Sequence, residues 1–171
     1  MAGNRTILLA DDEQADFILF RVALQHAGLD HYLAHVTDGQ ETIDYLSGQV
    51  PYADRTQYPF PDLLLLDLKM PRLTGFDVLR WLQHRPELRK LPVVVFSSSE
   101  QPDDMAESRR LGALRYQSKP PDMPGLVKFA LELDRAWLSP PQPGDGLSAA
   151  AGKQKTTRPS VRARNNSRPK R

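Results

Sequence analysis

The sequence predicts an α/β protein built on a doubly wound parallel sheet of five strands. Short apolar runs alternate five times with segments of helical periodicity, which is the pattern of a sheet covered by helices. Two of the runs, 63–66 and 93–96, are apolar without alternation, as expected of central strands buried on both faces. Aspartate directly follows both the run 7–10 and the run 63–66, so acidic groups are expected at one edge of the sheet.

The individual elements follow from apolar spacing and from turn residues. We expect strands at 5–10, 32–36, 63–66, 93–96 and 114–117. We expect helices at 14–27, 39–46, 76–86, 103–111 and 123–137. The first helix should bury one stripe, made of Leu19, Phe20, Ala23, Leu24 and Ala27. Asp38 and Glu41 have the spacing of a capping box for the second helix, and Gly112 suits a left-handed cap after the fourth.

Composition divides the chain into two parts. Residues 1–138 hold all the periodic segments and form one predicted domain, whereas 139–171 carry eight Lys/Arg against one Asp and no aromatic residue. Because this segment has too little apolar surface to offset the conformational entropy lost on ordering, we expect residues 139–171 to form a disordered basic tail. No segment resembles a membrane span or a secretory leader, which predicts a cytoplasmic protein. The absence of cysteine excludes disulfides, thiolate zinc sites and cysteine nucleophiles.

The acidic groups Asp11, Asp12 and Asp67 are the strongest chemical signal. If their strands are neighbours, the three side chains converge at the carboxyl edge of the sheet, where open α/β folds place their ligands. Carboxylates held that close raise one another's pKa unless they share a cation. Oxygen ligands of this kind favour Mg²⁺, and a metal beside a carboxylate suggests phosphoryl chemistry.

These acidic residues are part of a longer series of motif residues along the chain. The series consists of Asp11-Asp12, Asp67, Met70-Pro71, Gly75, Ser97, Tyr116 and Lys119-Pro120. In order and spacing it resembles the receiver domains of two-component response regulators over about residues 5–138. The resemblance implies a CheY-like, flavodoxin-like sheet of order 2-1-3-4-5. The loop 51–54, the stretch 85–89 and a domain that ends at Trp137-Leu138 look most like the single-domain regulators associated with phytochromes.

The resemblance also implies a role for each site residue. Asp67 would accept the phosphoryl group as a nucleophilic carboxylate. Mg²⁺ would be bound directly by Asp12, through water by Asp11, and also by Asp67 and the backbone carbonyl of Lys69. Lys119 would neutralise phosphoryl charge, and its bond to Pro120 is generally cis in the family.

Two further residues would act as the switch. The Ser97 hydroxyl would bind the phosphoryl group and draw its loop inward, and Tyr116 would then turn inward. Tyr116 could instead be only a strand aromatic that covers the core.

The predicted function is a phosphorylation switch that receives its phosphoryl group from a sensor histidine kinase and signals by protein contacts. The subgroup resemblance indicates a phytochrome-type kinase. Homodimerisation is expected through the face of the fourth helix, fifth strand and fifth helix. The protein would not be an enzyme beyond self-phosphorylation and autodephosphorylation.

Two alternatives remain at this point. A haloacid-dehalogenase-like phosphatase also uses a strand-end aspartate and Mg²⁺, but it requires Asp-x-Asp on one loop. A nucleic-acid-binding protein could act through the basic tail, but no aromatic residue interleaves the tail for base stacking, which favours a solubilising or partner-docking role.

Overall fold

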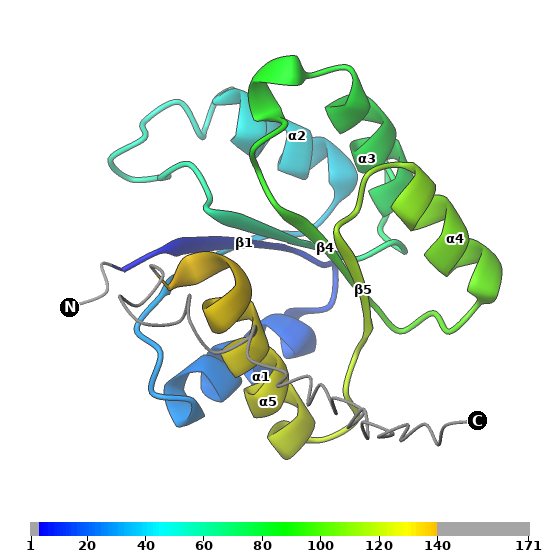
Figure 1. The fold of residues 1–171 in the computed structure, drawn as a ribbon. Coiled ribbons are helices and arrows are strands. Elements are labelled where there is room, and N and C mark those ends of the chain that lie inside the picture. The colour runs from blue at the N-terminus through cyan, green and yellow to red at the C-terminus, as the bar shows by residue number, and fades with distance from the viewer. Residues whose placement is uncertain (1–3, 140–171) are drawn as a thin grey trace, which may run out of the picture. The chain divides into compact units, whose positions relative to one another are not determined.

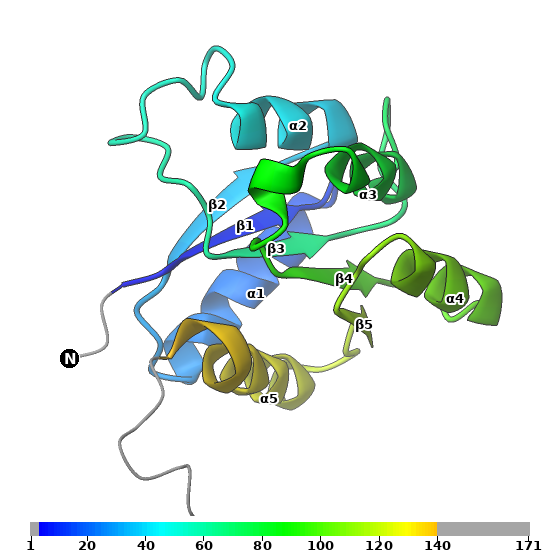
Figure 2. The same cartoon turned by 45° about the horizontal axis from the view of Figure 1, so that its top comes forward.

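The computed structural model describes residues 4–139, so the predicted basic tail lies outside the described residues from position 140 onward. The described chain forms a five-stranded parallel sheet of order β2-β1-β3-β4-β5, which confirms the predicted fold (Figures 1 and 2). The strands are β1 (Thr6–Ala10), β2 (Tyr32–Val36), β3 (Leu63–Leu66), β4 (Val93–Ser97) and β5 (Arg115–Ser118). None of the helices between residues 4 and 139 has the length and apolar character needed to span a membrane.

Helices cover both faces of the sheet, as Figure 2 shows. They are α1 (Gln14–His26), α2 (Gly39–Ser47), α3 (Gly75–Gln83), α4 (Pro102–Arg110) and α5 (Met123–Leu133). A 3₁₀ turn at Pro86–Leu88 precedes β4, and a π-helical turn at Asp134–Leu138 extends α5. Helices α1 and α5 pack together on one face, while α2, α3 and α4 lie on the other.

Alternate residues of the central strands supply two separate cores. In β3, Leu64 and Leu66 join the cluster under α2 and α3, whereas Leu63 and Leu65 join the one under α1 and α5. All four are fully buried, because every side chain of a strand covered on both faces enters one core or the other. This explains why the run is apolar without alternation.

The structure corrects details of the predicted elements. Leu19 is 44% exposed because α1 turns its Phe20, Ala23 and Leu24 side towards α5 and the sheet, so Leu19 lies outside the buried stripe. Leu114 is 63% exposed and precedes β5, which begins one residue later than predicted. An apolar side chain near a helix stripe or a strand end is therefore not always buried.

The capping box predicted at α2 is only half formed. Asp38 caps the helix by accepting a hydrogen bond from the Glu41 N–H, as expected. The Glu41 carboxylate, however, accepts from the Thr37 N–H and hydroxyl and from the Tyr52 hydroxyl. It therefore fixes the end of β2 and the loop after α2 instead of returning to Asp38.

Candidate functional site

The predicted acidic residues meet at the carboxyl edge of the sheet, where β1 and β3 are neighbours. The Asp67 N–H donates to the Ala10 carbonyl at 2.9 Å, and the Asp11 N–H to the Val36 carbonyl at 2.9 Å, so ladder hydrogen bonds hold both backbones. Carboxylate oxygens of Asp11, Asp12 and Asp67 lie within 4.8 Å of one another. Asp11 and Asp67 are buried and Asp12 is exposed, so the cluster extends from the interior of the protein to its surface.

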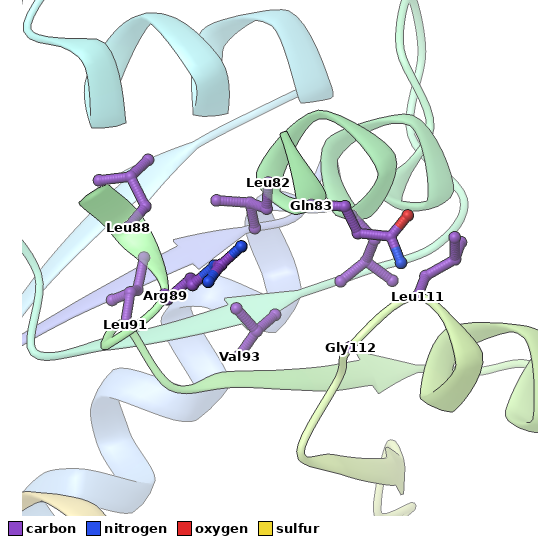
Figure 3. Close-up of a pocket in the computed structure, with 9 residues that line it drawn as sticks. Leu82, Gln83, Leu88, Arg89, Leu91, Val93, Leu111 and Gly112 are labelled. Atoms are coloured by element: carbon purple, nitrogen blue, oxygen red, sulfur yellow. The ribbon is translucent and has the colours of Figure 1, made fainter. Parts of the chain in front are cut away.

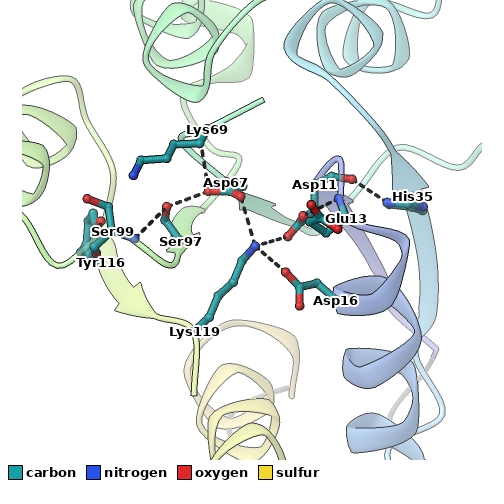
Figure 4. Close-up of polar contacts among 10 residues, drawn as sticks. All are labelled: Asp11, Glu13, Asp16, His35, Asp67, Lys69, Ser97, Ser99, Tyr116 and Lys119. Atoms are coloured by element: carbon teal, nitrogen blue, oxygen red, sulfur yellow. Dashed lines mark hydrogen bonds and ion pairs between the residues drawn. The ribbon is translucent and has the colours of Figure 1, made fainter. Parts of the chain in front are cut away.

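Lys119 reaches into this cluster from the end of β5 (Figure 4). Its Nζ lies 2.8 Å from Asp11 Oδ2 and 3.1 Å from Asp67 Oδ2. The expected cis bond to Pro120 is not found: among residues 4–139 the cis peptide bond is Val50-Pro51. Lys119 is aimed instead by its N–H, which donates to the Ser97 carbonyl at 2.9 Å and prolongs the pairing of β5 with β4.

Asp16, which the sequence reasoning missed, also lies in the site. Its Oδ2 accepts a hydrogen bond from Lys119 Nζ at 2.6 Å. Burial alone would lower the pKa of Lys119, but hydrogen bonds and ion pairs with Asp11, Asp16 and Asp67 outweigh burial and raise it. Lys119 therefore stays a cation over the whole physiological range.

Asp11 is an acidic residue whose charged form is disfavoured by its surroundings. Burial raises its pKa to about 6, even though Lys119 and the Glu13 N–H act in the opposite direction. Its Oδ1 accepts from the Glu13 N–H at 3.0 Å, whereas Oδ2, although close to Lys119 Nζ, has no hydrogen-bond donor in suitable geometry. A buried carboxylate oxygen that has an ammonium nearby but no hydrogen bond, next to two more carboxylates, fits a hard divalent cation such as Mg²⁺.

The residues predicted to act as the switch form a continuous chain of hydrogen bonds that begins at Asp67. The Ser97 hydroxyl, fully buried, donates to Asp67 Oδ1 at 2.7 Å. The Ser99 N–H lies 3.4 Å from Ser97 Oγ, and the Ser99 carbonyl accepts from the Tyr116 hydroxyl at 2.7 Å (Figure 4). Burial raises the pKa of Tyr116, so this hydroxyl stays a donor. Ser99, which the sequence alone did not single out, is the link between the two predicted residues.

The loop after Asp67 is held by contacts that sequence reasoning also missed. Its Arg72 has a positive φ of 61° and pairs with Asp38 at the start of α2. Thr74 and Asp77 form a complete capping box at α3. The Thr-x-x-Asp spacing is visible in the sequence and could have revealed this capping box.

Close backbone packing holds the same loop against Asp67. The Lys69 N–H donates to Asp67 Oδ1 at 3.3 Å, and the Gly75 N–H donates to the Leu68 carbonyl at 3.1 Å. A Cβ on Gly75 would lie 2.9 Å from Leu68 Cα and closer still to the Asp67 carbonyl oxygen. The metal-ligand role of the Lys69 carbonyl stays a prediction.

A separate pocket of about 360 Å³ lies away from this site (Figure 3). Val93 at the first residue of β4 lines it, whereas Ser97 at the last residue of β4 lies in the acidic site. Leucines from α3, from the 3₁₀ turn and from the end of α4 also line it, together with Gln83 and Arg89. The pocket and the acidic cluster are therefore at opposite ends of the strand.

The sequence pattern of the response regulator receiver domain matches residues 7–130. The chain belongs to the response regulator receiver domain family. The response regulator Rcp1 of Synechocystis sp. is 33% identical over 134 residues, which cover 78% of this chain and 89% of that protein. These findings give the phosphatase and nucleic-acid alternatives no support.

Two solved structures show the same receiver fold. The phosphorylated cyanobacterial phytochrome response regulator RcpA is 34% identical with a TM-score of 0.72, covering 80% of this chain and 96% of its own. The Mn²⁺-bound form of Rcp1 is 32% identical with a TM-score of 0.69, covering 80% and 99%. The family is thus the one that the motif residues predicted, and the phytochrome-associated subgroup is the one that the segments 51–54 and 85–89 and the end of the domain indicated.

Proposed function

We propose that this receiver domain accepts a phosphoryl group on Asp67 from a sensor histidine kinase and signals through protein contacts. The observation that carries the proposal is the setting of the Asp67 carboxylate. One of its oxygens accepts from Ser97 and the other from Lys119, and it lies beside the buried Asp11 carboxylate, whose Oδ2 is 2.8 Å from the same ammonium. A hydroxyl, an ammonium and a carboxylate oxygen able to ligate a metal are what an incoming phosphoryl group requires.

In the proposed transfer, one Asp67 oxygen attacks the phosphorus, a new P–O bond forms, and the bond to the donor breaks with its electrons leaving on the donor. Mg²⁺ held by Asp11, Asp12, Asp67 and the Lys69 carbonyl would supply positive charge to the transferred phosphoryl oxygens. Lys119 adds a second cation, and the Ser97 hydroxyl donates to a phosphoryl oxygen instead of to the carboxylate. The Mn²⁺ in the related Rcp1 structure supports a divalent ion here, and we propose Mg²⁺ as the resident one.

Signal output follows from the chain that begins at Asp67. When Ser97 exchanges the carboxylate for a phosphoryl oxygen, its loop shifts, and Tyr116 follows because its hydroxyl bonds the Ser99 carbonyl. Tyr116 lies on β5, beside α4, so a downstream partner can read its position.

The setting of this switch is inferred from the relatives and from the fold. Similarity to the regulator RcpA supports a phytochrome-type kinase as the donor. The cytoplasm, the typical location of receiver domains, is the location we propose for this one. Turnover is limited to self-phosphorylation and autodephosphorylation. We propose homodimerisation through the α4, β5 and α5 face, on which Arg115 already pairs with Glu132 within the chain at 2.7 Å.

The test is the intact mass after incubation with Mg²⁺ and acetyl phosphate, for the native chain and Asp67→Asn. The native chain should gain one phosphoryl group and Asp67→Asn none. Equal gains in both would remove Asp67 from its role. Steady release of phosphate at many turnovers per minute would instead indicate a hydrolase.

A further inference from the structure

Asp16 makes the shortest of the three contacts between the Lys119 ammonium and a carboxylate. Lys119 Nζ lies 2.6 Å from Asp16, 2.8 Å from Asp11 and 3.1 Å from Asp67. An ammonium has three protons, and its hydrogen bonds go to Asp16 and Asp67, while Asp11 Oδ2 is close but lacks hydrogen-bond geometry. Asp16 is thus the carboxylate nearest to the Lys119 ammonium, although it is not one of the metal-binding group.

The local structure of α1 commits Asp16 to this contact. Asp16 is the third residue of the helix, a position from which an acidic side chain commonly returns to the N-cap N–H. That N–H belongs to Glu13 and is already bonded to Asp11 Oδ1. The Asp16 carboxylate therefore leaves the helix end and turns to Lys119, while the positive end of the helix dipole favours its charge.

A divalent metal ion and the Lys119 ammonium would compete for the same carboxylates. The Asp11, Asp12 and Asp67 oxygens form the group able to hold a metal, and the Lys119 ammonium touches two of these three residues. A divalent ion can use them fully only if the ammonium withdraws. Asp16 stands outside that group and offers Lys119 a carboxylate that the metal does not need.

We propose that Asp16 is a positioning residue that holds the Lys119 ammonium when a divalent cation occupies Asp11 and Asp67. Without Asp16, Lys119 stays on Asp11 and Asp67 and competes with the metal. The inference rests on the proposed function, because it assumes the same metal site. It adds to that site a residue, Asp16, that binds the Lys119 ammonium while the metal ion is bound.

The test is a double-mutant cycle with the Mg²⁺ dissociation constant, from calorimetric titration, as its readout. Asp16→Asn should weaken Mg²⁺ binding about tenfold in the native background, the size expected for residues in direct contact. In a Lys119→Met background the same change should alter the constant by less than about twofold, because no ammonium then competes. Equal weakening in both backgrounds would mean a plain charge effect and would overturn the proposal, as would no weakening in the native background.

Matched variants separate this role from a structural one. Asp16→Glu keeps the carboxylate and should bind Mg²⁺ within about twofold of the native chain, and weakening as large as that of Asp16→Asn would contradict the proposal. Asp103→Asn removes an acidic residue from the first turn of α4, where Asp103 is exposed, and should leave Mg²⁺ affinity unchanged. If Lys119→Met does not fold, Lys119→Gln completes the cycle. The mass gain of the native chain is unaffected by these outcomes, so failure here is distinguishable from failure of the phosphoacceptor proposal.

Discussion

At the scale of single residues, the Ser97 hydroxyl is fixed before any phosphoryl group arrives. It is fully buried and donates to the Asp67 carboxylate at 2.7 Å. Ser97→Ala should lower the free energy of unfolding by about 1–2 kcal/mol in EDTA, because a buried carboxylate oxygen loses a donor. Urea unfolding measures this. Ser97→Thr keeps the hydroxyl and should lose less, and an alanine variant as stable as the native chain would contradict the prediction.

Gly75 supports Asp67 by having no side chain. The Cβ of alanine would collide with backbone atoms of Asp67 and Leu68, so the proposed phosphoacceptor would have to shift. Gly75→Ala should cost about 2 kcal/mol of stability and slow labelling by acetyl phosphate at least about tenfold.

The control for this prediction is Gly28→Ala. Gly28 has a positive φ of 70°, and no atom outside its immediate chain neighbours lies within 4 Å of where an alanine Cβ would stand, so alanine there costs backbone strain alone. Its labelling rate should equal that of the native chain. A Gly75→Ala variant that is labelled as fast as Gly28→Ala would show that the loop can yield without moving Asp67.

At the scale of elements, Glu41 joins the end of β2, the start of α2 and the following loop. Burial would raise the pKa of Glu41, but hydrogen bonds from Tyr52 and Thr37 outweigh it, so the pKa lies below its usual value of 4.5. The stability that Glu41 contributes is therefore complete above pH 4.5 and is lost as the pH falls through its lower folded value. Glu41→Gln should cost about 0.5–1 kcal/mol at pH 7 and progressively less below pH 4.5.

Urea unfolding from pH 3 to pH 7 measures this dependence. Glu87→Gln changes an exposed glutamate and should run parallel to the native chain at every pH. A difference between native and Glu41→Gln that stayed constant to pH 3 would mean that the carboxylate contacts do not depend on its charge.

The elements also show what the sequence can predict. Asp11, Asp12 and Asp67 could be placed because period and length locate strand ends, and parallel neighbours bring those ends together. The Asp16 contact could not, because it joins residues 103 positions apart and depends on how α1 and β5 are oriented across the sheet. The exposure of Leu19 depends in the same way on how α1 lies against α5.

At the scale of the whole molecule, the sheet brings four acidic residues and one lysine to one edge. Ladder hydrogen bonds fix the backbones of Asp11 and Asp67, and burial, with a smaller contribution from the Asp67 charge, disfavours the charged form of Asp11. We therefore expect the acidic cluster to lower the stability of the metal-free protein. A divalent cation that binds the cluster should raise the free energy of unfolding.

Asp11 offers the sharpest test of this coupling. Its carboxyl is fully buried, one oxygen lacks a donor, and its pKa is raised to about 6, so above pH 6 its charge destabilises the folded state. In EDTA at pH 7.5, Asp11→Asn should melt at a higher temperature than the native chain. Mg²⁺ at 100 times its dissociation constant should stabilise the native chain by about 2.7 kcal/mol, or roughly 8 °C, and should not stabilise Asp11→Asn. Asp12→Asn changes an exposed position, so its melting temperature in EDTA should differ little from the native one, whereas most of the rise caused by Mg²⁺ should be lost. If Asp11→Asn melts below the native chain in EDTA, the charge of Asp11 does not destabilise the folded protein and the prediction is wrong.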